Sequence, residues 1–388
     1  MQSANLLIFM KNSIFISSLL AVCVTYIAQA DDSYKAFYMN SSSSGSKTVE
    51  GDLNVNYFNL NINVGTVKVT GTTTINSEMG KDKVNETATK IQNIRDNTEV
   101  TVYGKNYYGD WTYYNNQVLA ESTFESKNII FNGPTTAGPQ KFLIKGTVKT
   151  DSFIVNASAE CPVILNISSG TTSGRLESFT QGEQGTLVIN ENVVLEAGTQ
   201  GYGGKYNDEI TLETVINGGT ANLVDCVTVG NITLNSGEIN FSYAHETQQG
   251  DAGIAVGDLT VKSGTLNIEE NVSIGDLTLN NCTVKFSDGA VIDLGENNLT
   301  LGDNVAITLS VESLENIEGL TLFQTTGKVE GFEELTVTFV DATGAKKEAA
   351  VSYSNGSVVT TAIPEPTTAT LSLLALAGLA ARRRRASR

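Results

Sequence analysis

The chain has 388 residues, with 25 basic and 42 acidic side chains and a formal net charge of −17. This acidic balance disfavours nucleic acid and anionic lipid headgroups as partners, because both repel a negatively charged surface. Only 5 prolines occur in the chain, so few positions forbid a central β-strand.

The N-terminal segment, residues 1–30, has the features of a secretory signal peptide. Lys11 precedes an apolar run over 14–27, and the small residues Ala28 and Ala30 stand where signal peptidase requires them. Asp31 is therefore the expected first residue of the mature chain.

Two segments near the expected mature start have no strand pattern. Residues 31–46 are predicted to be a flexible leader, because this short segment is rich in serine. Residues 77–97 are predicted to form a short helix that covers the N-terminal end of the fold. The apolar residues there fall near helical spacing, at Val84, Ala88, Ile91 and Ile94.

Aromatic residues cluster in the segment 103–114, which includes the only tryptophan of the chain. Aromatic rings with polar edges stack on sugar rings or form contact surfaces. The candidate glycan contacts are Tyr107, Tyr108, Trp111 and Tyr113. The alternative is that these side chains cover the first turns of the fold, as alternate residues of strands do.

Residues 47–310 show self-similarity built from short strand patterns. Residues 219–242 align without a gap on residues 264–287, and GDLTV at 257–261 precedes GDLTL at 275–279 by 18 residues. The earlier segment GTLVINENVVL, residues 185–195, matches GTLNIEENVSI, residues 264–274. A period near 20 made of short strands predicts a parallel β-helix, or β-solenoid, in which neighbouring rungs complete one another's core.

Residues 311–361 change in character and predict a closing cap. The segment reads as antiparallel hairpins, with turns at 342–346 and 354–356. A cap is expected because an open last rung would expose strand edges.

Residues that could carry chemistry are isolated along the chain. The only histidine, His245, lies in a polar segment with no nucleophile motif nearby, so we expect a solvated loop residue. Cys161, Cys226 and Cys282 lie within strand-like apolar sequence and are expected to be small buried hydrophobes. Neither a metal site nor a cofactor is expected.

Carboxylates provide the alternative, enzymatic interpretation. Asp208–Glu209 and Glu269–Glu270 are adjacent pairs, and a polysaccharide lyase or glycosidase on a β-helix scaffold would use acidic side chains. Neighbours in a strand point to opposite faces, however, so neither pair is singled out as catalytic. We expect a protein that is not an enzyme, with no catalytic residues.

The C-terminal segment, residues 362–388, has three parts in a fixed order. Pro364, Glu365 and Pro366 precede an uncharged apolar run over 369–381, which is followed by an arginine cluster. The cluster comprises Arg382, Arg383, Arg384 and Arg385. The apolar run is predicted to enter a bilayer as a transmembrane helix, with its basic end in the cytoplasm.

This tail resembles the PEP-CTERM sorting signal of Gram-negative bacteria. The resemblance covers residues 363–388 and implies export, transient anchoring in the inner membrane and removal of the tail by an exosortase. The apolar run is shorter than the roughly 20 residues that span a bilayer comfortably, so tilt or arginine snorkelling must compensate.

Removing both ends makes the expected mature body more acidic. Without Lys11 and the five arginines of 367–388, the body has 19 basic and 42 acidic residues and a net charge of −23. The sequence thus predicts an all-β protein of the cell surface or extracellular matrix, adhesive or structural, and similar to autotransporter passengers in repeat style. Its expected partners are signal peptidase and exosortase during export, and then a glycan or exopolysaccharide.

Overall fold

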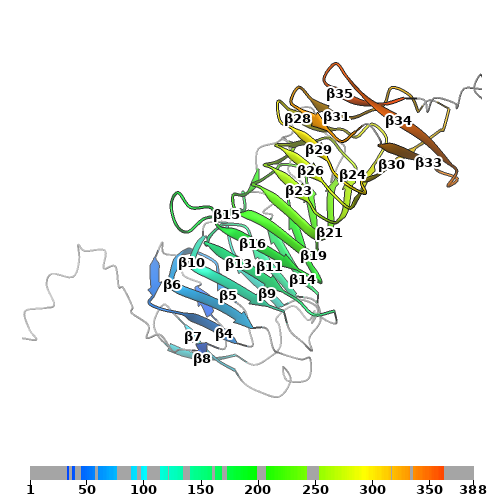
Figure 1. Cartoon of the computed structure of the whole chain (residues 1–388). Helices are drawn as coiled ribbons and strands as arrows, with labels where there is room; N and C mark the ends of the chain where they lie inside the picture. Colours follow the sequence, from blue (N-terminus) through cyan, green and yellow to red (C-terminus); the bar gives the residue numbers. More distant parts are fainter. Residues whose placement is uncertain are drawn as a thin grey trace, which may run out of the picture.

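The computed structural model consists of strands and turns over the part of the chain that it describes. The described residues are 33–34, 37–39, 45–56, 60–76, 89–93, 98–102, 114–120, 122–133, 140–159, 162–167, 173–198, 207–242, 253–315, 317–332 and 335–361. Parallel pairing dominates among their strands, which stack along one long axis (Figure 1). The all-β class and the repeating, solenoid character of the body are confirmed.

Each complete rung contributes one strand segment to each of three parallel faces. In chain order, the first face contains β3 (Ser46–Val49), the first halves of β6 (Gly65–Asn76) and β10 (Ser122–Asn132), β12 (Thr147–Lys149), β15 (Arg175–Glu177), β18 (Asp208–Ile210), β20 (Val227–Val229), β22 (Ile254–Val256), β25 (Val272–Ile274), β28 (Ile292–Gly295) and β31 (Thr321–Thr325).

The second face follows the first after a corner of the rung. It contains β1 (Ser33–Tyr34), β4 (Leu53–Asn56), the second halves of β6 and β10, β13 (Ser152–Asn156), β16 (Thr186–Asn190), the first halves of β19 (Glu213–Val224) and β21 (Ile232–Ser242), β23 (Leu259–Val261), β26 (Leu277–Leu279), β29 (Leu299–Leu301) and β32 (Val329–Glu330).

The third face closes the rung. It contains β2 (Phe37–Met39), β5 (Leu60–Ile62), β9 (Tyr114–Val118), β11 (Gln140–Ile144), β14 (Val163–Ile167), β17 (Val193–Ala197), the second halves of β19 and β21, β24 (Gly264–Ile268), β27 (Cys282–Phe286), β30 (Ala306–Val311) and β33 (Thr336–Asp341).

The core is formed by alternate residues of these strands. Inward Val, Leu, Ile and Phe side chains are buried, while their neighbours in the strand point outward. Phe142 links two stacked aromatic neighbours, with ring centroids 5.7 Å from Phe131 and 5.6 Å from Phe153. Each rung therefore buries its inward face against the neighbouring rungs, as the repeat predicted.

The repeated Gly-Asx sequence has a structural role at the corner between the first and second faces. The Asx side-chain oxygen of one rung accepts a hydrogen bond from a backbone N–H of the next, at 2.8–3.1 Å. The accepting residues are Asn231, Asp258 and Asp276, each of which follows a glycine, and Asn298, which follows Asn297. Asp258 and Asp276 are 18 residues apart, which is the period read from the sequence.

Both ends of the β-helix carry antiparallel strands. At the C-terminal end, β34 (Lys346–Ser354) pairs with β33, and β35 (Ser357–Thr361) pairs with both β34 and β31. These strands thereby join the last edges of the first and third faces (Figure 1). The turns lie where the sequence predicted them, but antiparallel pairing begins only at β34, because β31–β33 still stack as a parallel rung.

The N-terminal end differs from the sequence-based expectation. The predicted helix over 77–97 is wrong where it is described, because β7 (Thr89–Asn93) forms an antiparallel pair with β8 (Thr98–Val102). β7 also pairs with β2 and so extends the third face. β-branched residues alternate along these strands, which favours a pleated conformation over a helix.

The predicted leader, 31–46, also contains paired strands. β1 and β2 lie within it and pair with β4 and β5, so these residues satisfy backbone groups that an edge would otherwise expose. The predicted signal peptide, 1–30, and the sorting segment, 362–388, lie outside the described residues. Within the described ranges, no helix has the length and apolar character needed to cross a membrane.

Candidate functional site

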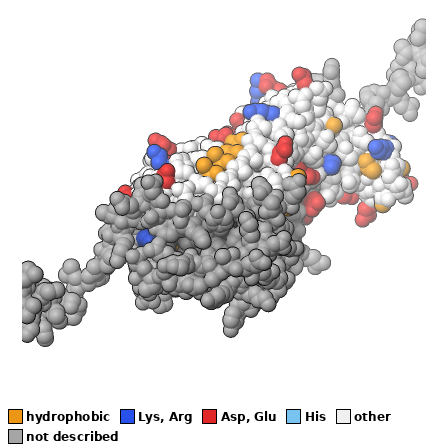
Figure 2. All heavy atoms as spheres, turned by 90° about the horizontal axis from the view of Figure 1, so that it is seen from below, with side chains coloured by type: hydrophobic (Ala, Val, Ile, Leu, Met, Phe, Trp, Pro, Cys, Tyr) orange, Lys and Arg blue, Asp and Glu red, His pale blue; other side chains and the backbone are white. Residues whose placement is uncertain are grey.

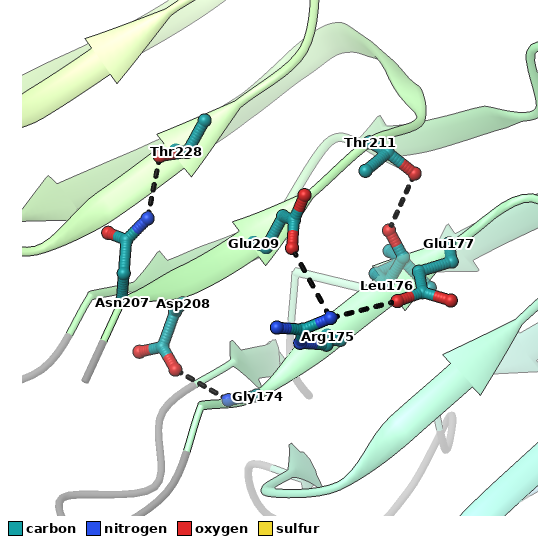
Figure 3. Close-up of polar contacts among 9 residues, drawn as sticks. All are labelled: Gly174, Arg175, Leu176, Glu177, Asn207, Asp208, Glu209, Thr211 and Thr228. Carbon is teal, nitrogen blue, oxygen red and sulfur yellow. Dashed lines mark hydrogen bonds and ion pairs between the residues drawn. The ribbon is translucent and has the colours of Figure 1, made fainter.

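Asp208 and Glu209 are adjacent in β18 but lie on opposite sides of the strand. Asp208 points inward and has 0% of its surface exposed, whereas Glu209 points outward toward Arg175 (Figure 3). A glycosidase requires two carboxyl groups that flank the same substrate bond. Because the strand separates these two groups, the adjacent pair does not have that geometry.

The Asp208 carboxyl group is held in the interior by backbone contacts. Its Oδ1 atom accepts a hydrogen bond from the Gly174 N–H at 2.7 Å, and its Oδ2 atom has no hydrogen-bond partner among the described residues. Burial raises the pKa of Asp208 from its ordinary value to about 7, although the N–H groups of Gly174 and Gly198 oppose this rise. The side chain therefore titrates near neutral pH.

Arg175 organises the outward side of the same strands. Its Nη1 atom lies 3.6 Å from Glu177 Oε1 and 3.7 Å from Glu209 Oε2 (Figure 3). The Arg175 side chain is 49% exposed, so each ion pair contributes at most about 1 kcal/mol to stability. Arg175 thus lies between two carboxylates, one on β15 and one on β18.

The first face carries a second charged row in preceding rungs. Glu125 lies between two lysines, with Oε2 3.9 Å from Lys68 Nζ and Oε1 3.8 Å from Lys149 Nζ. These residues occupy matching positions of β6, β10 and β12. Alternating charge between stacked strands favours the observed register over a slipped one.

The Glu269–Glu270 pair precedes β25. Burial raises the pKa of Glu270, and the negative charges of Asp225 and Glu269 raise it further, while the Asn271 N–H opposes the shift. Across the described part of the chain, no group of three or more His, Cys, Asp or Glu side chains could hold a metal ion. Glu269 and Glu270 therefore form an acidic pair that is not part of a metal-binding group among the described residues.

An open depression of about 360 Å³ lies on the first face, at β22, β25 and β28 and the corner after β28. Ser273, Asp293 and Asn297 are the polar side chains among its lining residues. Asp293 Oδ1 accepts a hydrogen bond from the Gly295 N–H at 2.9 Å, which places this carboxylate in a local turn. The depression has one carboxylate in its lining, Asp293, whereas a glycosidase requires two carboxyl groups.

The second face has a continuous outward row of β-branched residues. The row follows the strand register through nine rungs, and its members are partly exposed. Its members are Thr74, Ile130, Ile154, Val188, Val215, Thr233, Thr260, Thr278 and Thr300. We call it the β-branched row.

An asparagine ladder borders this row at the ends of the strands. Each later amide N–H donates to the amide oxygen of the preceding rung, at 2.7–3.3 Å. The ladder comprises Asn76, Asn132, Asn156, Asn190, Asn217 and Asn235. Stacked amides of this kind hold a regular spacing along the axis.

Hydrophobic side chains also reach the surface elsewhere in the described part. On the side drawn in Figure 2, they form a short row along the long axis, within an uncharged area, and charged side chains lie around it. Exposed apolar rows on a soluble fold mark candidate contact surfaces. On the second face itself, the β-branched row is apolar at Ile130, Ile154, Val188 and Val215 and is bordered by amide groups, a combination suited to binding rather than to acid–base chemistry.

Most of the site residues predicted from the sequence lie outside the described part of the structure. Tyr107, Tyr108, Trp111, Tyr113 and His245 lie outside the described residues, as do the sorting residues of 364–385 and Cys161. Cys226 and Cys282 are buried, as expected, and burial raises the pKa of the Cys282 thiol to about 11.

The asparagine ladder was missed in the sequence. Its signal is present, because asparagine ends several successive strand patterns, such as SFIVN at 152–156 and TLVIN at 186–190.

No protein-family profile, curated protein or solved structure matches the chain.

Proposed function

We propose that this chain is an exported, non-enzymatic protein of a Gram-negative cell surface or extracellular matrix, with an adhesive or structural role. Signal peptidase removes residues 1–30, and an exosortase recognises Pro364, Glu365 and Pro366 before removing the tail. The apolar run over 369–381 anchors the precursor transiently in the inner membrane as a transmembrane helix. The arginine cluster at 382–385 remains in the cytoplasm.

The observation that carries the adhesive or structural role is the regular outer surface of the second face. A long stack of rungs repeats outward β-branched residues and asparagines at a fixed spacing, which suits contact with an extended partner. The N-terminal and C-terminal sequence features support export and sorting.

The polysaccharide lyase or glycosidase alternative is less well supported by the described carboxylates. Asp208 is buried, and Glu209 lies on the other side of β18 in an ion pair with Arg175. An assay for reducing ends and unsaturated products, with the mature chain and a polysaccharide panel, distinguishes the alternatives. Product formation would favour the enzyme.

Mass spectrometry of the native protein from fractionated cells tests the proposed route. We expect a mature N-terminus at Asp31, a C-terminus near Pro366 and recovery from the cell surface or the medium. Recovery of the intact chain from the cytosol, with residues 1–30 and Arg388 still present, would overturn the proposal.

Two tail variants sharpen this test. Glu365→Ala is expected to leave the precursor uncleaved in the membrane fraction, because the sorting triplet is altered. A variant without the arginine cluster is expected to weaken retention of the tail at the inner membrane. It combines Arg382→Ala, Arg383→Ala, Arg384→Ala and Arg385→Ala. Arg388→Ala is the matched control, since it removes an arginine outside the cluster.

A further inference from the structure

We propose that the second face of β6, β10, β13 and β16 binds a neutral polysaccharide chain lying along the axis of the β-helix. We call these outward residues the neutral panel. The inference deepens the proposed function, because it names the partner class and the surface that an adhesive or matrix protein would use. It does not involve the aromatic segment 103–114.

The absence of charge distinguishes the neutral panel. Its residues are Thr72, Thr74, Asn76, Asn128, Ile130, Asn132, Ser152, Ile154, Asn156, Thr186, Val188 and Asn190, which are partly exposed. On the first face, the same rungs carry Lys68, Glu125, Lys149, Arg175 and Glu177. In a chain of net charge −17, such a panel fits an uncharged partner, because an ionic polymer would find no complementary charge there.

The asparagine ladder gives the panel a repeated hydrogen-bonding capacity. A side-chain amide has two N–H donors and an oxygen with two lone pairs. An interior ladder residue such as Asn156 donates once to Asn132 and accepts once from Asn190. Among the hydrogen bonds of the described residues, this leaves one donor and one lone pair on Asn156, and the interior ladder positions recur at about the 4.8 Å spacing of stacked strands.

The β-branched row supplies the apolar complement. Ile130, Ile154 and Val188 lie side by side on successive strands, and each is partly exposed. A sugar chain presents C–H surfaces beside regularly repeated hydroxyl groups. The methyl groups of the β-branched row can contact the C–H surfaces, and the neighbouring amides can hydrogen-bond to the hydroxyl groups.

The size of the panel favours a narrow chain over a folded protein. Four strands about 4.8 Å apart, each with about five residues at 3.3 Å, cover roughly 300 Å². A stable protein interface requires roughly 800 Å² per partner. A second copy would also bring a like-charged body close to the first, whereas a neutral chain suffers no such repulsion.

The direction of the β-branched row supports an extended ligand. Beyond the neutral panel, the row continues through Val215 to Thr233, Thr260, Thr278 and Thr300. A polymer bound on the panel would therefore meet further uncharged side chains along the same line.

Affinity electrophoresis of the mature chain in gels containing soluble dextran, mannan or β-glucan tests the inference. Alginate serves as the charged comparison, because an acidic chain has no net attraction for an anionic polymer. We expect at least one neutral polymer to retard the protein and alginate not to do so. Ile154→Glu, which places a charge in the panel, is expected to weaken retardation by about tenfold or more.

Thr147→Glu is the matched control, because it introduces the same charge on the first face of the same rung. Asn156→Ala provides a second variant, which removes a ladder amide without adding charge. Thermal melts establish that each variant is folded. Retardation that is unchanged in folded Ile154→Glu or Asn156→Ala, or its absence with all three neutral polymers, would overturn the inference.

Sedimentation velocity distinguishes a second copy from a polysaccharide. A dimer of the mature chain that Ile154→Glu dissociates and Thr147→Glu preserves would show that the panel binds another copy, contrary to the inference. If the protein is exported but binds no neutral polymer, the proposed ligand is wrong and the proposed export is not affected. If the protein is cytosolic but binds a neutral polymer, the proposed export is wrong and the proposed ligand is not affected.

Discussion

At the scale of single residues, Asp208 is the acidic side chain that the described part of the fold buries. It is buried, its Oδ1 atom accepts one backbone hydrogen bond at 2.7 Å, and its pKa is raised to about 7. In the unfolded chain an aspartate has a pKa near 3.8. Between these values the folded state holds a proton that the unfolded state has released, so stability falls as pH rises through this range.

Asp208→Asn is expected to remove this dependence, because the amide keeps an oxygen for the Gly174 N–H and carries no charge. Relative to wild type, the variant should gain about 2–4 kcal/mol between pH 4.5 and pH 8, since each pKa unit corresponds to about 1.4 kcal/mol. Urea unfolding of both proteins at the two pH values measures the difference.

Glu209→Gln is the control at the neighbouring position, because Glu209 points outward, is partly exposed and is paired with Arg175. Its stability difference from wild type should change by less than about 1 kcal/mol over the same range. Equal pH dependence in wild type and Asp208→Asn would contradict a buried acid that titrates near neutrality.

At the scale of elements, the corner between the first and second faces explains the Gly-Asx repeat. A Cβ atom on Gly275 would lie 2.6 Å from Asp258 Oδ1 and 3.0 Å from the Gly257 carbonyl carbon. The same Asp258 oxygen accepts the Asp276 N–H at 3.0 Å. Glycine is required there because the side chain and backbone of the preceding rung occupy the space.

Gly275→Ala is therefore expected to destabilise the β-helix by about 1–3 kcal/mol, since the corner must shift to admit the methyl group. Chemical denaturation measures the change. Gly253→Ala is the matched control, because a Cβ atom there meets nothing within 4 Å. If the two variants were equally stable, the close packing at the Gly275 corner would be refuted.

At the scale of the whole molecule, stability and solubility depend on how the stack ends. β34 and β35 connect the final edges of the first and third faces, which leaves β32 with two residues at the end of the second face. Lys328 and Glu330 form an ion pair at this short edge. Short, charged and covered edges prevent other chains from adding strands.

Deleting residues 346–361 from the mature chain should uncover β31 and β33 as unpaired edges. We expect concentration-dependent association, because exposed edge strands pair with other chains. Light scattering over a dilution series measures it. A chain that ends at residue 361 is the control, and a monomeric deletion variant would show that the antiparallel strands do not protect the end.

Much of the β-helix could be predicted because its core repeats locally. Val227 and Val272 align in the sequence repeat, as do Leu234 and Leu279, and all four are buried at matching positions of their rungs. The face to which a strand belongs could not be predicted in this way. GTLVINENVVL spans the second and third faces, whereas the similar GTLNIEENVSI spans the third and first.

The candidate surface was less predictable than the core. Alternation predicts that Ile154 or Asn156 points to one side of a strand, but it does not give the neighbour on the next rung. The adjacent carboxylates Asp208 and Glu209 were correctly expected to diverge, while the deep burial of Asp208 depends on how Gly174 and Gly198 approach it.

The sequence by itself determined the all-β, repeating character of the body, because a period-two pattern with glycine corners is a local property of the chain. Only the tertiary structure decided which outward residues form continuous rows. Successive ladder asparagines are separated by 56, 24, 34, 27 and 18 residues. Insertions of unequal length hide the ladder in the sequence, whereas strand stacking restores a constant spacing because backbone hydrogen bonds set the distance between rungs.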